Sequence, residues 1–247
     1  MITTGSGRSS ARTQPAKPAL SRSAIVEAAL ALIDENGLAT VSMRKVATRL
    51  DTAAASLYVY VDDRKDLVEA AYDLALAGVR TPTAVEGSWR DQLRHVVVDQ
   101  IDVLASHGDI ALVALADAQI GSNSLRITER ILSLLRSGGV PDETCIAAAD
   151  LLDQFVTSSA IEQAAWARDA LSAGAEDPVS ASGEAMVSSA AGRIKAAYDA
   201  LSADEFPAIT AIEPHLAHTD PADRRAWKLD AVLDGVTAAL RSVAPES

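Results

Sequence analysis

The sequence predicts an all-helical protein with an N-terminal three-helix helix-turn-helix unit followed by a larger C-terminal helical bundle. Apolar residues make up 49% of the 247 residues but aromatic residues only 4%, and this composition, dominated by Ala and Leu, favours helix over strand. Apolar side chains recur at helical spacing along most of the chain, without strand-type alternation of any length. Capping residues and short breaks separate the periodic segments.

The chain begins with a segment that is not expected to fold. Residues 1–20 are rich in Ser, Thr, Arg and Pro and show no periodicity, which predicts a disordered arm. From Ser21 onward, apolar residues between Ile25 and Ile33 repeat on one helical face. Gly37 follows that stripe and provides a stop signal, so the first helix is expected to end there.

Three more helices are expected in the next 40 residues. Ser42 is a plausible N-cap for the second helix, and Asp51-Thr52 forms a very short break after it. Thr52 can then cap a third helix that runs to about Tyr60, and Asp63 can cap a fourth. The two middle helices are only about two turns long, so they must be held by packing against the first and the fourth.

The rest of the chain is also helical in pattern. Its expected elements are a helix from near Trp89 through Ile101, a helix over Ile110–Ile120, a helix ending at Gly138-Gly139, a long helix over about Thr144–Leu171, a loop over Ala173–Gly183, a helix over Glu184–Leu201, a proline-marked connection over Phe206–Pro221 and a last helix containing Leu229 to Leu240. We therefore divide the chain into an arm (1–20), a helix-turn-helix domain (21–80) and a second domain (81–247).

Charge is unevenly distributed along the chain, whose net charge is −12. Residues 1–50 carry seven basic and three acidic side chains, a net charge of +4, whereas the remaining residues carry 15 basic and 31 acidic ones, a net charge of −16. A basic head on an acidic body can still bind phosphate locally, because salt screens surface charges beyond about 8 Å.

The composition also predicts the compartment. The single cysteine, Cys145, excludes an internal disulfide framework and fits a reducing cytoplasm; it is interpreted as a small buried hydrophobe. The first residues lack the apolar core of a signal peptide, and no apolar run reaches the roughly 18 residues of a membrane span. A cytoplasmic protein without a membrane segment is expected.

Residues 40–68 form the segment that predicts function. They are patterned as helix, tight turn, helix and supporting helix, and the second short helix of such a unit can enter a major groove about 12 Å wide. Small residues, Ala53 to Ser56, allow close approach to bases, and Tyr58 and Tyr60 offer hydroxyl donors. Basic residues surround this element: Arg44, Lys45, Arg49, Arg64 and Lys65.

The run from Ile25 to Leu67 resembles the N-terminal domain of the tetracycline-repressor (TetR) family. The resemblance rests on Ala28-Ala29-Leu30 ahead of Gly37, on Val41-Ser42-Met43-Arg44, on Leu57-Tyr58 and on Asp63-Arg64-Lys65-Asp66-Leu67. It covers about a fifth of the chain. It implies a DNA-binding transcriptional regulator, a homodimeric repressor released from a palindromic operator when a small-molecule effector binds the C-terminal domain.

Position by position, the resemblance also implies which residues contact DNA. They are Met43, Arg44, Thr52, Ala54, Ala55, Ser56, Tyr58, Tyr60, Arg64 and Lys65. Two features depart from the family pattern. Asp51 occupies the turn position where the family usually has Gly, and that position often needs a positive φ. Asp62-Asp63 places negative charge near the expected phosphates, where it weakens binding unless the two residues cap the helix and orient Arg64.

The second domain offers weaker signals. Aromatic and amide side chains in otherwise aliphatic helices are candidates for an effector pocket, although ordinary core packing explains each of them equally well; they are Trp89, Gln119, Phe155, Gln163 and Trp166. The apolar faces of the helices around Asp150–Leu171 and Trp227–Val243 are candidates for a four-helix dimer contact.

Other function classes find little support. His215 and His218, with Glu213 and Asp220, have no well-spaced partner pair, so neither a metal nor another cofactor is expected. There is no Gly-x-Ser-x-Gly elbow and no phosphate-binding Gly-Lys-Ser/Thr, so no catalytic residue is expected and an enzyme is disfavoured. The acidic balance and Asp51 leave one alternative open: a ligand-binding helical dimer that has lost operator binding.

Overall fold

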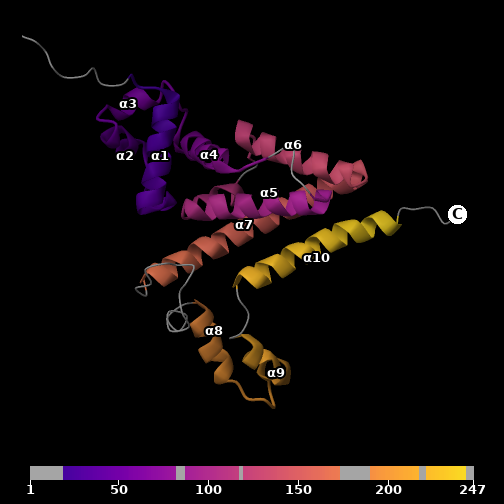
Figure 1. The fold of residues 1–247 in the computed structure, drawn as a ribbon. Coiled ribbons are helices and arrows are strands. Elements are labelled where there is room, and N and C mark those ends of the chain that lie inside the picture. The colour runs from indigo at the N-terminus through magenta and orange to yellow at the C-terminus, as the bar shows by residue number, and fades with distance from the viewer. Residues whose placement is uncertain (1–18, 82–86, 117–118, 173–189, 217–220, 243–247) are drawn as a thin grey trace, which may run out of the picture.

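The computed structural model describes residues 19–81, 87–116, 119–172, 190–216 and 221–242, and every regular element in these ranges is a helix (Figure 1). The elements are α1 (Arg22–Asn36), η1 (Leu38–Thr40), α2 (Met43–Arg49), α3 (Ala54–Leu57), α4 (Arg64–Ala75), η2 (Leu76–Gly78), α5 (Trp89–Ser106), η3 (Ile110–Leu115), α6 (Ser122–Ser137), α7 (Asp142–Ser172), α8 (Ala190–Asp199), α9 (Pro207–Leu216) and α10 (Pro221–Ser242). The all-helical fold class is confirmed.

The N-terminal helices form a small head (α1–α3) that packs on α4 at one end of the molecule (Figure 1). Two predicted caps are present: the Ser42 side chain accepts a hydrogen bond from the Lys45 amide, and the Asp63 side chain accepts one from the Asp66 amide. Leu57 of α3 is completely buried. The helix α3 packs on α2 and α2 packs on α1, and burial of such side chains in the common core holds the short middle helices, which are unstable alone.

The third helix differs from the prediction at its start. Thr52 does not cap it, because the Thr52 amide donates to the Ala47 carbonyl and Ala53 is the N-cap residue, without a side-chain hydrogen bond. The helix itself is only four residues long. The amides of Tyr60 and Val61 both donate to the Leu57 carbonyl, so the chain stays in a helical turn beyond the end of α3.

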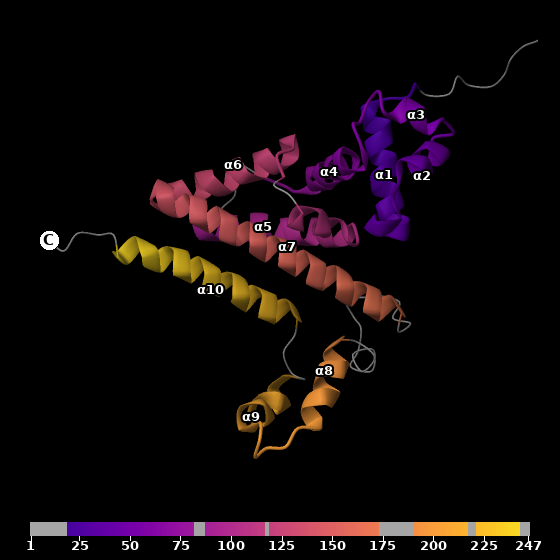
Figure 2. The same ribbon diagram turned by 180° about the vertical axis from the view of Figure 1, so that it is seen from behind.

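The body of the molecule consists of α5, α6, α7 and α10. The helix α5 packs against α6 and α7, and α10 lies alongside α7, as both ribbon views show (Figures 1 and 2). Buried leucines from all four helices share this core; they include Leu93, Leu135, Leu152, Leu229 and Leu233. Cys145 is buried as interpreted, and burial raises the pKa of its thiol.

The predicted helix over Ile110–Ile120 is wrong in type and length. The segment forms the 3₁₀-helix η3, which ends at Leu115. The Asp109 side chain does not cap η3. Instead its carboxylate accepts a hydrogen bond of 2.8 Å from the Leu38 amide in the head. The Asp109 carboxylate, which could have capped an α-helix over this segment, is therefore engaged in a tertiary contact.

The predicted connection over Phe206–Pro221 is also wrong, because it contains α9. Pro207 occupies the first position of this helix, where a missing N–H has no cost. The helix continues through Pro214. The helices α8 and α9 pack on each other and project away from the body (Figure 2). The predicted loop over Ala173–Gly183 and the first residues of the predicted helix over Glu184–Leu201 lie outside the described residues. The rest of that predicted helix contains α8.

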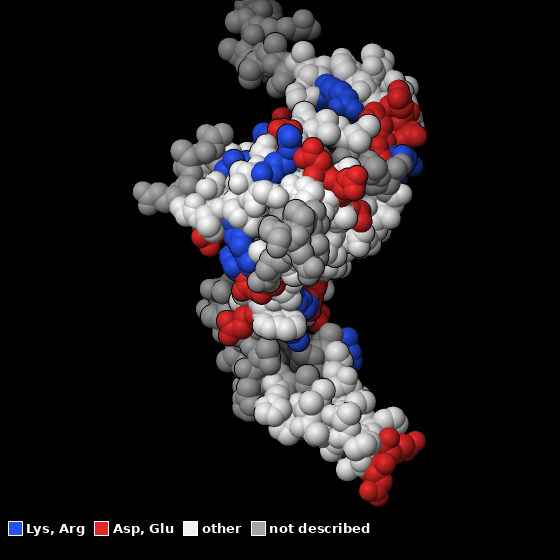
Figure 3. All heavy atoms as spheres, turned by 90° about the vertical axis from the view of Figure 1, so that its right-hand side faces the viewer, with Lys and Arg blue, Asp and Glu red and all other residues white. Residues whose placement is uncertain are grey.

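The surface carries both signs of charge. Figure 3, which views the side at the right of Figure 1, shows acidic and basic side chains interspersed over the molecule, with an acidic group at its lower tip. None of the helices within the described ranges is long and apolar enough to cross a membrane.

Candidate nucleic-acid interface

The turn between α2 and α3 is closed by an aspartate in a conformation that usually needs glycine. Asp51 has a φ of 48°, as its position in the motif predicts. The amide of Asp51 donates to the Thr48 carbonyl, and the next amide returns to Ala47. Aspartate tolerates this left-handed conformation better than most residues. The departure from glycine therefore leaves the helix-turn-helix geometry intact.

The predicted contact residues on this unit differ in exposure. Arg44, Ala55 and Tyr58 are exposed, and Tyr58 has 55% of its surface accessible. Thr52 and Ser56 are half-buried, and Ala54 and Tyr60 are half-buried against the core. Met43, which the resemblance places near the DNA backbone, has a buried side chain. Its apolar side chain packs in the hydrophobic core.

Arg22 and Arg49 of the head and Lys65 of α4 are engaged in ion pairs. Arg49 forms a two-pronged pair with Glu35 (2.7 and 2.8 Å), and these hydrogen bonds lower the pKa of the glutamate. Lys65 pairs with Glu69 and Arg22 with Asp66. Within residues 19–81, Arg44 and Lys45 are the exposed cations of α2 that have no ion-pair partner. Their charge is therefore available to a phosphate.

Arg64 braces the head instead of extending from it. Its Nε donates to the Val41 carbonyl and its Nη2 to the Leu38 carbonyl, both at 2.8 Å. This fork fixes the start of α4 against the segment that leads into α2. The position at which the family resemblance implies a phosphate contact thus has a structural function in this chain.

Of the two neighbouring acids, Asp63 has its side chain engaged within the chain, whereas the Asp62 side chain is exposed. Asp63 caps α4. The backbone amide of Asp62 donates to the Asp66 carboxylate at 3.0 Å. Asp66 also accepts from Arg22 of α1 at 2.7 Å. Neither aspartate orients Arg64 by a described contact. The charge of Asp63 is partly offset by the helix N-terminus that it caps.

The helix α4 connects the head to the body through a joint that the sequence did not reveal. The Asp73 carboxylate of α4 accepts from the amides of Asn123 (3.0 Å) and Ser124 (2.9 Å), and the Asn123 side chain donates to the Asp73 carbonyl (3.0 Å). The N-cap of α6, Gly121, provides no side-chain bond of its own. An acid of one helix thus caps the N-terminus of another.

The same two helices are joined again in the opposite direction. Arg126 of α6 donates to the carbonyls of Leu76 (3.2 Å) and Val79 (3.1 Å), which follow α4, and to the Thr81 hydroxyl (2.7 Å). We call these contacts of Asp73 and Arg126 the α4–α6 clamp. The clamp makes the position of α4 depend on the position of α6. Its acid and its arginine lie 53 residues apart in sequence, so no local pattern links them.

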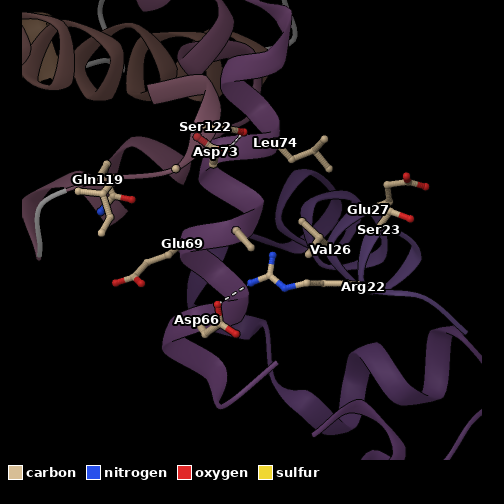
Figure 4. A pocket seen from close by; sticks show the side chains of 13 residues that line it. Arg22, Ser23, Val26, Glu27, Asp66, Glu69, Asp73, Leu74, Gln119 and Ser122 are labelled. Carbon is tan, nitrogen blue, oxygen red and sulfur yellow. Dashed lines mark hydrogen bonds and ion pairs between the residues drawn. The ribbon is translucent and has the colours of Figure 1, made fainter. Parts of the chain in front are cut away.

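A hollow of about 500 Å³ lies between the head and the start of α6 (Figure 4). Side chains from α1, α4 and the segment before α6 line it, including Glu27, Glu69 and Gln119. The Arg22 side chain extends from α1 across it to Asp66 of α4 (Figure 4). The hollow is therefore bordered by α1 and α4, which pack on each other, and by the segment that leads into α6.

The five residues predicted for an effector pocket do not form one site. Gln119 lines the hollow, whereas Trp89 packs against Gly138 and Phe155 is half-buried against the core. Gln163 bonds to Asp102 of α5 and to Arg225 of α10, and Trp166 lies 5.0 Å from the Arg224 guanidinium. These last two residues belong to a polar seam between α7 and α10.

The weaker histidine cluster can be placed only in part. Glu213 and His215 lie on α9, and His218 and Asp220 lie outside the described residues. Among the residues that the structure describes, no group of three His, Cys, Asp or Glu side chains is arranged to hold a metal ion.

Two curated regulators are similar to this chain. A transcriptional regulator of the helix-turn-helix type from Saccharopolyspora erythraea is 32% identical over 150 residues, which cover 61% of this chain and 64% of the relative. The repressor DrrR1 of Streptomyces coeruleorubidus is 29% identical over 148 residues, 60% of this chain and 55% of the relative. The chain thus matches less than two thirds of the length of either relative.

Solved structures match over more of the chain. ActR of Streptomyces coelicolor, a TetR family protein solved in complex with actinorhodin, has a TM-score of 0.76 and 30% identity and covers 90% of this chain and 97% of its own. BioQ, solved with its natural double-stranded DNA operator, has a TM-score of 0.54 and 28% identity and covers 59% of this chain and 88% of its own.

Family models match both parts of the chain. The model described as bacterial regulatory proteins of the tetR family matches residues 25–71, which run from the first turn of α1 into α4. The model described as the tetracyclin repressor-like C-terminal domain matches residues 81–240. An N-terminal helix-turn-helix, a C-terminal helical domain and these two matches together show that the chain belongs to the TetR family of transcriptional regulators.

Proposed function

We propose that this protein is a repressor that binds a palindromic DNA operator as a homodimer and is released by a small-molecule effector. The observation that carries the proposal is the outer face of α2 and α3. Arg44 and Lys45 present unpaired charge there, and Ala55 and Tyr58 lie exposed beside them. Cations bind phosphates, and small residues permit approach to base edges.

The dimer of this proposal is formed by the outer faces of α7 and α10. Large apolar side chains are exposed on both helices: Ile146 (72%), Leu151 (45%) and Trp227 (71%). Such residues are costly to expose and are typical of interfaces. A two-fold contact at this place gives two heads, whose recognition helices must lie about 34–36 Å apart to read successive major grooves.

Release follows from the α4–α6 clamp. An effector in the C-terminal domain, residues 81–247 in our division of the chain, stabilises one arrangement of α6, and the clamp transmits this arrangement to α4 through Asp73 and Arg126. Because α4 packs on α1, the head moves with it. Coupling of this kind amounts to about 1–3 kcal/mol, so the effector must bind the two arrangements with different affinity. ActR with actinorhodin is a precedent for a bound small molecule in this family.

The test is an unbiased selection of duplex DNA from a random pool with the full-length protein. We expect the selection to enrich a short palindrome. The affinity of the protein for this palindrome should fall steeply as the salt concentration rises. Arg44→Gln and Tyr58→Phe should each weaken binding without unfolding the protein, since both side chains are exposed. If a folded dimer enriches no sequence at low salt, the proposal is wrong and the alternative of a ligand-binding dimer without an operator replaces it.

A further inference from the structure

The recognition surface exposes one large apolar side chain that its fold does not use. Val59, directly after Tyr58 at the end of the α3 turn, has 80% of its surface accessible. The next-highest exposed fractions among the large hydrophobic residues of the described chain are 79% for Ile120 and 72% for Ile146. Isolated apolar residues on a surface are common, so exposure alone carries no conclusion.

The position of Val59 is more informative than its exposure. Leu57 and Val61 on either side are buried at 0% and 2%, so their burial fixes the turn and directs Val59 outward. The helical turn continues to Val61, which places Val59 four residues after the exposed Ala55 on the same side. Ala55 and Val59 therefore form a small exposed apolar strip on the same helix-turn-helix unit as Arg44.

The chemistry of the major groove offers one apolar partner for this strip. Base edges present hydrogen-bond donors and acceptors, and the only apolar group among them is the 5-methyl group of thymine. Valine is suited to contact it, because its branched side chain has few rotamers and loses little entropy on ordering. A polar residue at this place would instead select a donor or an acceptor.

We propose that Val59 determines operator specificity by contacting a thymine methyl group in each half-site. The inference rests on the proposed function, since it requires that the α3 surface enters a major groove. It adds a residue that the motif did not supply and fixes the base class that this residue reads. Val59 makes no contribution to phosphate binding.

The experiment replaces thymine by deoxyuridine, one position at a time, in the palindrome selected by the full-length protein. This replacement removes only the 5-methyl group. We expect one thymine per half-site at which the wild type loses about fourfold in affinity, equivalent to about 0.8 kcal/mol for one buried methyl. The Val59→Ala and Val59→Ser variants, which lack both γ-methyl groups of valine, should bind the thymine and deoxyuridine duplexes almost equally at that position.

Tyr58→Phe is the matched control. It should weaken binding to both duplexes alike and keep the fourfold difference, because it removes a hydroxyl and leaves Val59 in place. The inference is overturned if the Val59 variants keep the methyl dependence of the wild type, or if no thymine of the operator shows one. Failure to select any operator would instead overturn the proposed function, so the two failures are distinguishable.

Discussion

Gly121 at the N-terminus of α6 lies so close to Asp73 of α4 that a Cβ atom on the glycine would be 2.2 Å from the carboxylate carbon. No side chain fits there without moving the aspartate. Gly121→Ala should therefore break the cap on α6 and lower the free energy of unfolding by about 1–3 kcal/mol. Urea denaturation measures this loss, and operator affinity measured in parallel should fall as well.

The double variant shows whether the clamp is the cause. In an Asp73→Gly background the three nearest atoms that the new Cβ would meet, all of them Asp73 side-chain atoms, are absent, so adding Gly121→Ala should cost much less than it does in the wild type. Gly235 provides a control, since a Cβ at this position in α10 meets no atom within 4 Å. Additive losses at Gly121 and Asp73 would contradict the close approach as the source of the effect.

The two unpaired cations of α2 should dominate the salt dependence of operator binding. Each phosphate contact that is lost reduces the slope of log affinity against log salt by about 0.9. Arg44→Gln and Lys45→Gln are each expected to reduce it by this amount per bound head. Arg49→Gln removes the same charge from the same helix but from an existing pair with Glu35, so it should leave the slope nearly unchanged. Equal slopes for all three variants would refute this assignment.

Arg64 should respond to substitution as a brace. Lys keeps the positive charge but cannot reach the Leu38 and Val41 carbonyls together, as the arginine fork does. The Arg64→Lys variant is therefore expected to lose about 1 kcal/mol of stability and to bind the operator more weakly, with an unchanged salt slope. If Arg64→Lys binds as the wild type does while Arg64→Gln loses affinity and slope, the residue contacts phosphate instead.

Local signals predicted the head well. The caps Ser42 and Asp63 act within one turn, so they can be read from neighbouring residues, and both are present. Asp51 was expected to need a positive φ, and it has one. The local pattern therefore gave the starts of α2 and α4 and the turn, but not the start of α3, where Ala53 and not Thr52 is the N-cap residue.

Contacts between distant segments could not be predicted in the same way. Asp109 looks like an ordinary cap for a following helix, but its carboxylate binds Leu38 across 71 residues of sequence. Gln163 and Trp166 have the composition of pocket residues, yet Arg224 and Arg225 of α10 engage them. Which partner a polar side chain takes depends on the tertiary arrangement, and no periodicity encodes it.

Low pH should weaken the contact between Arg80, in the segment after η2, and Asp99 of α5. Asp99 is partly buried, which raises its pKa, but hydrogen bonds from the Arg80 side chain and amide and the charge of Arg80 lower the pKa more, to below the ordinary value of 3.8. A lowered pKa in the folded state means that the pair stabilises above pH 3.8 and is lost as the pH falls through the folded value. Asp99→Asn should therefore destabilise the protein at neutral pH. The midpoint of its urea unfolding should also change less with pH, between about pH 5 and pH 2, than that of the wild type. If the urea midpoint of the variant changed with pH as much as that of the wild type, Asp99 would be excluded as the source of the pH dependence.

Trp227 is the residue on which the proposed dimer should depend most. It is exposed by 71% on α10, the helix that packs beside α7. Aromatic residues that become buried at protein interfaces contribute a large share of the binding energy. Trp227→Ala is expected to raise the dissociation constant of the dimer at least about tenfold, measured by sedimentation equilibrium, and to leave the helical content unchanged. Leu115→Ala is the control, because Leu115 is exposed by 67% but lies at the end of η3, outside both helices of the proposed interface. Equal effects of the two substitutions would place the dimer contact elsewhere.

Because two linked heads bind a palindrome far more tightly than one, the Trp227 variant should also lose operator affinity at low protein concentration and regain it at high concentration.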